Sequence, residues 1–219
     1  MDKKITEKNT IKNNKRKVIL FRITVGAVIA LLALFALYSA LKFVSPDENE
    51  KKEQTVERHF YKPEPGEDIR NDKEYLDKQR DITYYDGYGN GYYITDGDYI
   101  KRGGLPLEVM HYFFDAVING NSAKLNALFS EEYLKSKGEF KDFGPQGIYD
   151  ITVALENEEI DKKTGNTTTV YTVSYKIMKN DGSFRRDIGS DSSRKQYFSI
   201  LETATDIFIT EIVDVKLIF

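Results

Sequence analysis

The carboxylate best suited to chemistry lies in the last predicted strand, residues 207–219. Glu211 interrupts a face otherwise formed by apolar residues, namely Ile207, Ile209, Val213, Val215, Leu217 and Phe219. A carboxylate on a core face needs a partner, a cavity or a local irregularity that turns it away. In a cavity, Glu211 would bind a ligand or transfer a proton, together with Asp115 or His111 from a predicted helix. A β-bulge at 210–212 would instead turn Glu211 to solvent.

Metal and thiol chemistry have little support in the sequence. The chain has two histidines, His59 and His111, at unmatched spacing, and no cysteine. Cysteine–zinc sites, thiol nucleophiles and disulfides are therefore excluded. No Walker loop, G-x-S-x-G motif or dinucleotide fingerprint occurs either. We expect no metal, no cofactor and no catalytic residue, and hence a protein that is not an enzyme.

Tyrosines dominate residues 82–104. Asn90-Gly91 predicts a hairpin with a two-residue turn between Tyr-rich strands. Their rings would either bind another protein or pair across the strands to stabilise the hairpin. The candidates for interaction are Tyr84, Tyr85, Tyr88, Tyr92 and Tyr93.

A second charged cluster lies between two predicted strands. It contains the basic residues Arg185, Arg186, Arg194 and Lys195, interleaved with Asp187 and Asp191. We interpret it as a solvated loop face, the alternative being a docking patch for an acidic partner. The whole chain has 32 basic and 35 acidic residues and a net charge of −3. We therefore expect no nucleic-acid partner.

An uncharged run over residues 23–41 predicts a transmembrane helix, which we assign to residues 23–44. At 1.5 Å per residue, its 19 residues span about 28 Å, close to the thickness of the hydrocarbon core. Residues 1–22 carry eight basic side chains against two acidic ones, whereas residues 45–59 are mainly acidic. This asymmetry predicts a cytoplasmic basic tail, 1–22, and an exported remainder.

The alternative for this run is a cleaved signal peptide. Such peptides have a shorter apolar region that ends in a small-x-small site. Here the candidate site begins with the bulky Tyr38. We therefore favour an uncleaved anchor in a bacterial-type single-pass cell-membrane protein.

Residues 45–81 are charged, poor in apolar residues and interrupted by prolines. This composition predicts an exposed stalk, with a helical stretch around residues 72–80. The alternative is an irregular arm that packs along the domain.

We assign the exported domain to residues 105–219. Helical periodicity runs over 105–137, with Pro106 in the first turn, Gly120 ending one helix and Ser122 capping the next. From Gly147 onward the period changes to two, with turns between successive strands. Helices followed by an antiparallel meander indicate an α+β domain with helices packed on a sheet.

The run MHYFFDAVINGNSAKLNALFSEEYL, residues 110–134, followed by long strands, resembles the nuclear transport factor 2-like superfamily. The resemblance covers residues 105–219 and implies a curved, cone-like antiparallel sheet, often with a pocket. A membrane-anchored form is similar to the inner-membrane scaffold subunits of type IV secretion and conjugation machines. This similarity implies a protein-interaction or scaffold module that is anchored in the membrane. Its partners would be other envelope proteins or further copies of the same chain. The alternative is a small-ligand-binding or weakly enzymatic domain with a pocket around Glu211.

Overall fold

The computed structural model describes residues 58–215. The predicted tail 1–22, the predicted membrane helix 23–44 and the first part of the predicted stalk, 45–57, lie outside the described residues, as does 216–219. Within 58–215, none of the helices has the length and apolar character needed to cross a bilayer.

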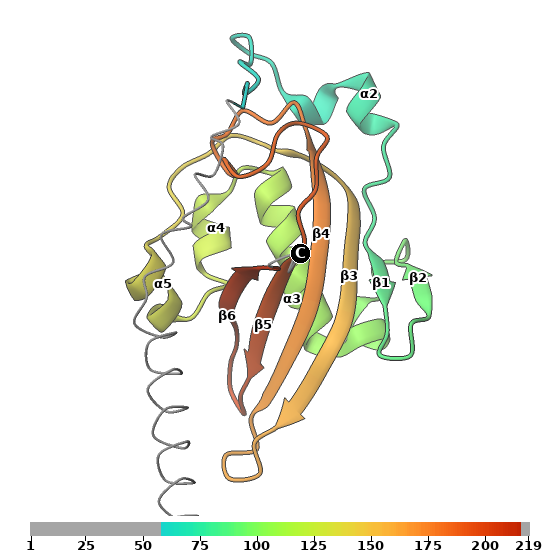
Figure 1. Ribbon diagram of the computed structural model, residues 1–219, viewed down its shortest axis with the longest axis vertical. Helices are drawn as coiled ribbons and strands as arrows, with labels where there is room; N and C mark the ends of the chain where they lie inside the picture. The colour runs from blue at the N-terminus through green and yellow to red at the C-terminus, as the bar shows by residue number, and fades with distance from the viewer. Residues whose placement is uncertain (1–57, 216–219) are drawn as a thin grey trace, which may run out of the picture. The chain divides into compact units, whose positions relative to one another are not determined.

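The described residues form an α+β domain around one six-stranded sheet (Figure 1). The spatial order of the strands is β2-β1-β3-β4-β5-β6. Their bounds are β1 Thr83–Tyr85, β2 Gly91–Tyr93, β3 Gly147–Ile160, β4 Thr167–Met178, β5 Gln196–Glu202 and β6 Ile207–Asp214.

The sheet is mixed, which corrects the antiparallel prediction. Four of the five neighbouring pairs are antiparallel, but β1 pairs with β3 in parallel, with Tyr84 opposite Val153. The chain leaves β1, forms β2 and three helices, and returns as β3. Such a long connection permits a parallel pair, which a tight turn cannot join.

The predicted alternation in β3 and β4 is confirmed. Ile151 and Val153 of β3 and Tyr171, Val173 and Tyr175 of β4 are buried, while their neighbours are more exposed. Both strands are long and visibly bent in Figure 1. Two shifts in the β3–β4 register accompany the bend, as expected of bulges.

Helices lie on one face of this sheet (Figure 1). They are α3, Tyr99–Ile118, α4, Ser122–Asn126, and α5, Glu131–Lys137. Non-helical backbone at Gly103 and Gly104 divides α3. Its core-facing part therefore begins near residue 105, with Pro106 in the first turn as predicted.

The turn between α3 and α4 contains Gly120, whose φ is +63°, so the predicted left-handed cap is confirmed. The predicted cap at Ser122 is wrong by one residue. Asn121 caps α4, because its side chain accepts a hydrogen bond from the Lys124 amide at 2.9 Å. Ser122 instead donates to Asp142.

The described part of the predicted stalk packs against the domain. Residues 58–81 contain the short helices η1, Ile69–Asn71, and α2, Lys73–Leu76. Tyr75 of α2 is buried and donates from its hydroxyl to the Ile148 carbonyl at 3.0 Å. The exposed stalk therefore does not extend over 58–81, and the irregular-arm alternative holds there. The predicted helix over 72–80 is limited to α2.

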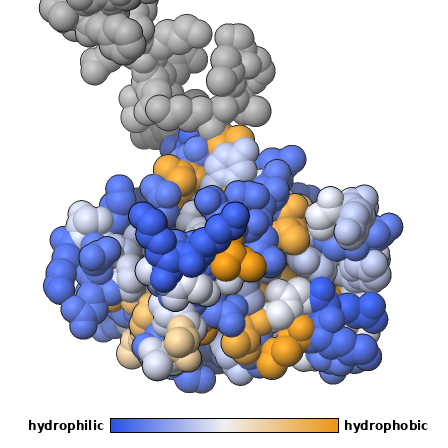
Figure 2. Space-filling view, turned by 90° about the horizontal axis from the view of Figure 1, so that it is seen from below, coloured by the Kyte–Doolittle hydropathy of each residue, from blue (hydrophilic) through white to orange (hydrophobic). Residues whose placement is uncertain are grey.

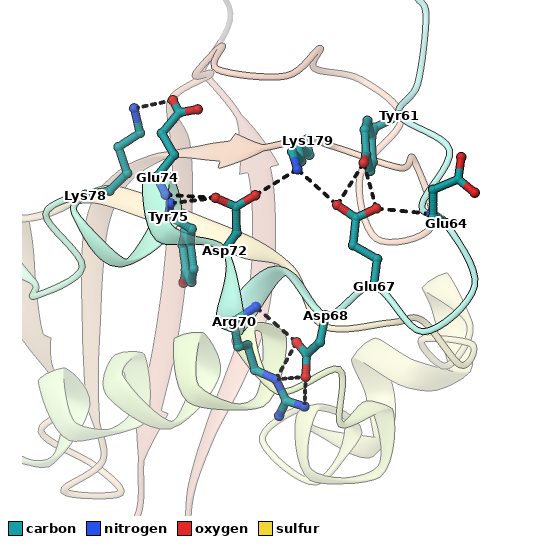
Figure 3. A network of polar contacts seen from close by, with 10 residues as sticks. All are labelled: Tyr61, Glu64, Glu67, Asp68, Arg70, Asp72, Glu74, Tyr75, Lys78 and Lys179. Carbon is teal, nitrogen blue, oxygen red and sulfur yellow. Dashed lines mark hydrogen bonds and ion pairs between the residues drawn. The ribbon is translucent and has the colours of Figure 1, made fainter.

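Lys179, at the end of β4, holds this arm (Figure 3). Its ammonium donates to Asp72 at 2.8 Å and to Glu67 at 3.0 Å. These hydrogen bonds raise the pKa of Lys179, the one with Asp72 most. They also lower the pKa of both carboxyls, and for Glu67 the hydrogen bond from Tyr61 contributes most. The contact therefore weakens as the pH falls through the lowered carboxyl pKa values or rises through that of Lys179.

Candidate functional site

Glu211 does not lie in a cavity, which corrects its predicted role as a ligand-binding residue. Glu211 pairs with Ser199 and Ile209 pairs with Ile200, so Thr210 is an extra residue in β6. This bulge turns Glu211 outward, and its side chain is exposed. The bulge interpretation of the sequence pattern is therefore the one that holds.

The two helix residues proposed beside Glu211 are engaged elsewhere. His111 stacks on Tyr99 with ring centroids 4.3 Å apart, and partial burial lowers its pKa despite the opposing effect of Asp115. Asp115 accepts a hydrogen bond from the side chain of Asn119 at 2.9 Å. Neither residue, nor Glu211, lines the cavity described below.

The tyrosines of the predicted hairpin separate into two groups. Tyr84 is buried and Tyr92 half-buried, and their rings stack at 6.5 Å. Tyr85, Tyr88 and Tyr93 are exposed, Tyr88 to 93% and Tyr93 to 66%. The first pair fits the structural interpretation, and the exposed three remain available to a partner.

The hairpin itself is confirmed, but its turn is longer than predicted. Tyr85 pairs with Gly91, which leaves residues 86–90 as a five-residue loop. The Asp86 side chain accepts hydrogen bonds from the amides of Tyr88 and Asn90, both at 2.9 Å. An Asx-type loop of this kind displaces the two-residue turn that Asn90-Gly91 indicates.

The structure reveals an open cavity of about 360 Å³ between the helices and the inner face of β4, β5 and β6. Phe113 of α3 and Tyr133 of α5 line it from the helical side. Its walls are aromatic and its polar groups come from one loop and two strand ends. The lining residues used below are Phe113, Tyr133, Phe140, Tyr175, Phe184, Arg185, Arg186, Asp187, Gln196, Phe198, Ile212 and Asp214.

The aromatic walls have a rigid base and a more accessible rim. Phe113 and Phe198 are buried and pack edge to face with centroids 5.1 Å apart. Tyr133, Phe140 and Phe184 are only partly buried. The rim rings can therefore contact a bound molecule while the base rings hold the core together.

Arg185 fixes the polar side of the cavity. It is only 7% exposed and pairs through two guanidinium nitrogens with Asp187, the Nε–Oδ1 distance being 2.8 Å. Its Nη1 also donates to the Tyr175 hydroxyl at 3.1 Å and to Gln196 Oε1 at 2.8 Å. One buried side chain thus orients three others.

Burial and pairing act in opposite directions on these groups. Burial is the largest single effect, and it lowers the pKa of Arg185 and raises that of Asp187. The hydrogen bonds and charges around each group together outweigh burial, so the pKa of Arg185 is raised and that of Asp187 is lowered. Burial raises the pKa of Tyr175, with Arg185 opposing it. At neutral pH the ion pair is therefore charged and the Tyr175 hydroxyl keeps its hydrogen.

Asp214 extends the polar row to the end of β6. Gln196 donates from Nε2 to Asp214 Oδ1 at 3.1 Å, and Arg194 lies 3.3 Å from the other carboxylate oxygen. The row thus runs from Tyr175 through Arg185 and Gln196 to Asp214.

The sequence interpretation missed Arg185, which it assigned to a solvated loop. Arg186 does behave in that way, since it is exposed and its side chain donates, within the described part of the chain, to the Gly182 carbonyl alone, at 3.2 Å. The sequence signal that could have indicated a buried loop is the presence of Phe184 and Ile188, the only apolar residues in 179–196. Both pack against the core and draw the loop inward.

The cavity has the parts of a binding site rather than of a metal centre. Among residues 58–215, no three histidine or acidic side chains are placed to hold a metal ion together. Comparisons with family models, curated proteins and solved structures found no match to this chain. The cavity and the sequence features described above are therefore the basis for a proposed function.

Proposed function

We propose that this chain is a membrane-anchored extracytoplasmic protein that binds a small ligand in the cavity between α3, α5 and β4–β6. The observation that carries the proposal is the combination of aromatic walls with a polar row that Arg185 holds in place. Ligand sites are typically concave, mainly apolar and supplied with a few convergent polar groups, and 360 Å³ lies at the lower end of their volumes.

Preorganisation further supports a binding role. The polar side chains already contact one another, so a ligand would not have to order them. A module built only for scaffolding has no need of an open cavity beside its core. We place no catalytic residue in the site, because the carboxylates of Asp187 and Asp214 are both held by arginines.

A tryptophan on β6 tests the cavity. Ile212 is paired with Phe198 on the inner face, so Ile212→Trp is expected to fill the cavity. Glu211→Trp is the matched control, because the side chain before Ile212 on the strand points to the other face, is exposed and does not line the cavity. Saturation-transfer NMR on the full chain in detergent should find fragments that bind the wild type and Glu211→Trp but not Ile212→Trp.

Overpacking costs about 1–3 kcal/mol, so circular dichroism must first show that both variants fold. Tyr133→Trp narrows the cavity from α5 and provides a second obstruction. Finding no ligand at all, or ligands that bind regardless of both obstructions, would contradict the proposed function.

The proposed anchor rests on the uncharged run at residues 23–41 and on the basic tail before it. Because the chain lacks cysteine, single cysteines can report its topology. A membrane-impermeant maleimide added to intact cells should label Lys162→Cys, in the exposed β3–β4 loop, and should not label Lys8→Cys. Labelling of Lys8→Cys alone would reverse the topology.

We also propose that the domain is a member of the nuclear transport factor 2-like superfamily, with a cone-like sheet. The support is the run at residues 110–134, the helices on one sheet face and the bent strands β3 and β4 (Figure 1). Membership of this superfamily would be consistent with a pocket, but it would not identify the ligand.

A second candidate function is an interaction module of an envelope or conjugation assembly. The observation that favours it is the exposure of Tyr85, Tyr88 and Tyr93, which lie on β1, on the loop and on the edge strand β2. Tyrosine is enriched in interfaces and edge strands have free backbone groups. The face in Figure 2 is mainly hydrophilic, with hydrophobic residues in small separate patches, so it offers no broad apolar surface for a partner.

A further inference from the structure

The charges of the polar row are paired with one another. Arg185 pairs with Asp187, and Asp214 pairs with Arg194. Arg186 also lines the cavity, but it is exposed and its charge is solvated. An anionic ligand would lie close to the two carboxylates, and a cationic ligand close to the two guanidinium groups. At the polar row either ligand would lose hydration without gaining a free counter-charge, because these two ion pairs already neutralise each other. The cavity therefore favours a ligand without net charge.

The polar row offers both acceptors and donors. Among residues 58–215, each Asp214 oxygen has one protein contact, with Gln196 or with Arg194, and a carboxylate oxygen can accept more than one hydrogen bond. The lowered pKa of Asp187 keeps it ionised as an acceptor. The Tyr175 oxygen accepts from Arg185, which leaves its own hydrogen for a ligand. Hydroxyl groups, which donate and accept at once, suit this arrangement.

The other side chains that line the cavity are mainly aromatic. Tyr133, Phe140 and Phe184 are partly exposed, and Phe129 stacks on Tyr133 at 4.7 Å and thereby fixes its ring. Aromatic faces bind the C–H side of an apolar or amphipathic ring through burial and dispersion. The cavity thus has an apolar side and a hydrogen-bonding side, which face different parts of the same ligand.

We propose that the cavity binds a neutral sugar ring, a deepening that rests on the proposed ligand-binding function. A pyranose presents C–H groups on its faces and hydroxyls along its edge, and it has no net charge. At about 30 Å³ per water, 360 Å³ corresponds to the volume of about a dozen waters, which leaves room for a single hexose. The rim rings contact the sugar face, and Asp214, Asp187 and Tyr175 contact its hydroxyls.

Isothermal titration calorimetry on the full chain, in a detergent without a sugar headgroup, tests this inference. The probes are glucose and N-acetylglucosamine as neutral rings, and glucuronate and glucosamine as their charged counterparts. We expect a neutral ring to bind at least about tenfold more tightly than the charged ones, a difference of about 1.4 kcal/mol. Asp214→Asn should weaken binding of the neutral ring by a similar factor.

Glu211→Gln is the matched control, because Glu211 lies three residues away on β6 but outside the cavity. It should leave the affinity unchanged. Equal binding of neutral and charged rings, or equal effects of the two substitutions, would overturn the sugar assignment.

If no sugar binds, but other fragments bind the wild type and do not bind Ile212→Trp, the sugar assignment is overturned and the proposed function stands. Absence of any cavity ligand would instead remove the proposed function itself.

Discussion

Replacing Arg185 with methionine is expected to lower the free energy of unfolding by about 2–3 kcal/mol. Loss of one partner of a buried ion pair typically costs about 3–5 kcal/mol, and we expect less here because Asp187 is about one-third exposed. The substitution also leaves Tyr175 and Gln196 without a hydrogen-bond partner they have in the wild type.

Arg186→Met is the matched control for this substitution. Arg186 is the next residue along the chain and has the same charge, but it is exposed and its side chain donates only to the Gly182 carbonyl. Surface changes of this kind usually stay within about 0.5 kcal/mol. Urea unfolding of the full chain, followed by circular dichroism, compares the two variants.

The difference between wild type and Arg185→Met should also depend on pH. Pairing lowers the pKa of Asp187 in the folded protein. Its contribution to stability is therefore present above the unfolded pKa of about 3.9 and is lost as the pH falls through the folded value. The cost of Arg185→Met should shrink in acid. Equal costs for the two arginine substitutions at neutral pH would show that the Arg185 network does not organise the cavity.

Gly120→Ala is expected to destabilise the domain by about 2–5 kcal/mol. An alanine Cβ there would lie 2.7 Å from the Gly144 carbonyl carbon and from the Pro145 nitrogen. These are backbone atoms, which cannot move aside as a flexible side chain can, so overpacking adds about 1–3 kcal/mol. The φ of +63° adds the left-handed strain of about 1–2 kcal/mol.

Gly165→Ala separates these two costs. Gly165 has a φ of +76°, but an added Cβ would meet no atom within 4 Å. Only the backbone strain applies, and we expect a loss of about 1 kcal/mol. Thermal and urea unfolding of both variants measure the difference. Equal losses would mean that the contact between the α3–α4 turn and residues 143–145 is not as tight as described.

Local signals in the sequence predicted much of the fold. Pro106 and Gly120 bound the core-facing part of α3, because a fixed φ and a positive φ are demands that few other residues meet. The period of two in 147–155 predicted β3, because burial of one face imposes it.

Long-range features could not be predicted in this way. The parallel pairing of β1 with β3 depends on where three helices return the chain. Tyr75 and Lys179 hold the arm 58–81 through contacts with residues far away in the sequence, so composition alone indicated a stalk.

The candidate site was the least predictable part. The sequence pattern placed Glu211 on the core face, because the alternation of side chains along a strand does not reveal the extra residue at Thr210. The sequence did not indicate that Arg185 is buried, because its partners Tyr175 and Gln196 come from two different strands. A buried charge in a loop is recognisable only when the groups that compensate it are brought together by the fold.

A crystal structure of the full chain, soaked with the neutral sugar that binds most tightly in the titrations, would show whether the cavity holds a sugar ring. We expect ligand density between the rings of Tyr133 and Phe184 and the carboxylate of Asp214, with hydroxyls within hydrogen-bond distance of the polar row. Density at another surface, or a cavity closed by its own side chains, would contradict the proposed sugar site.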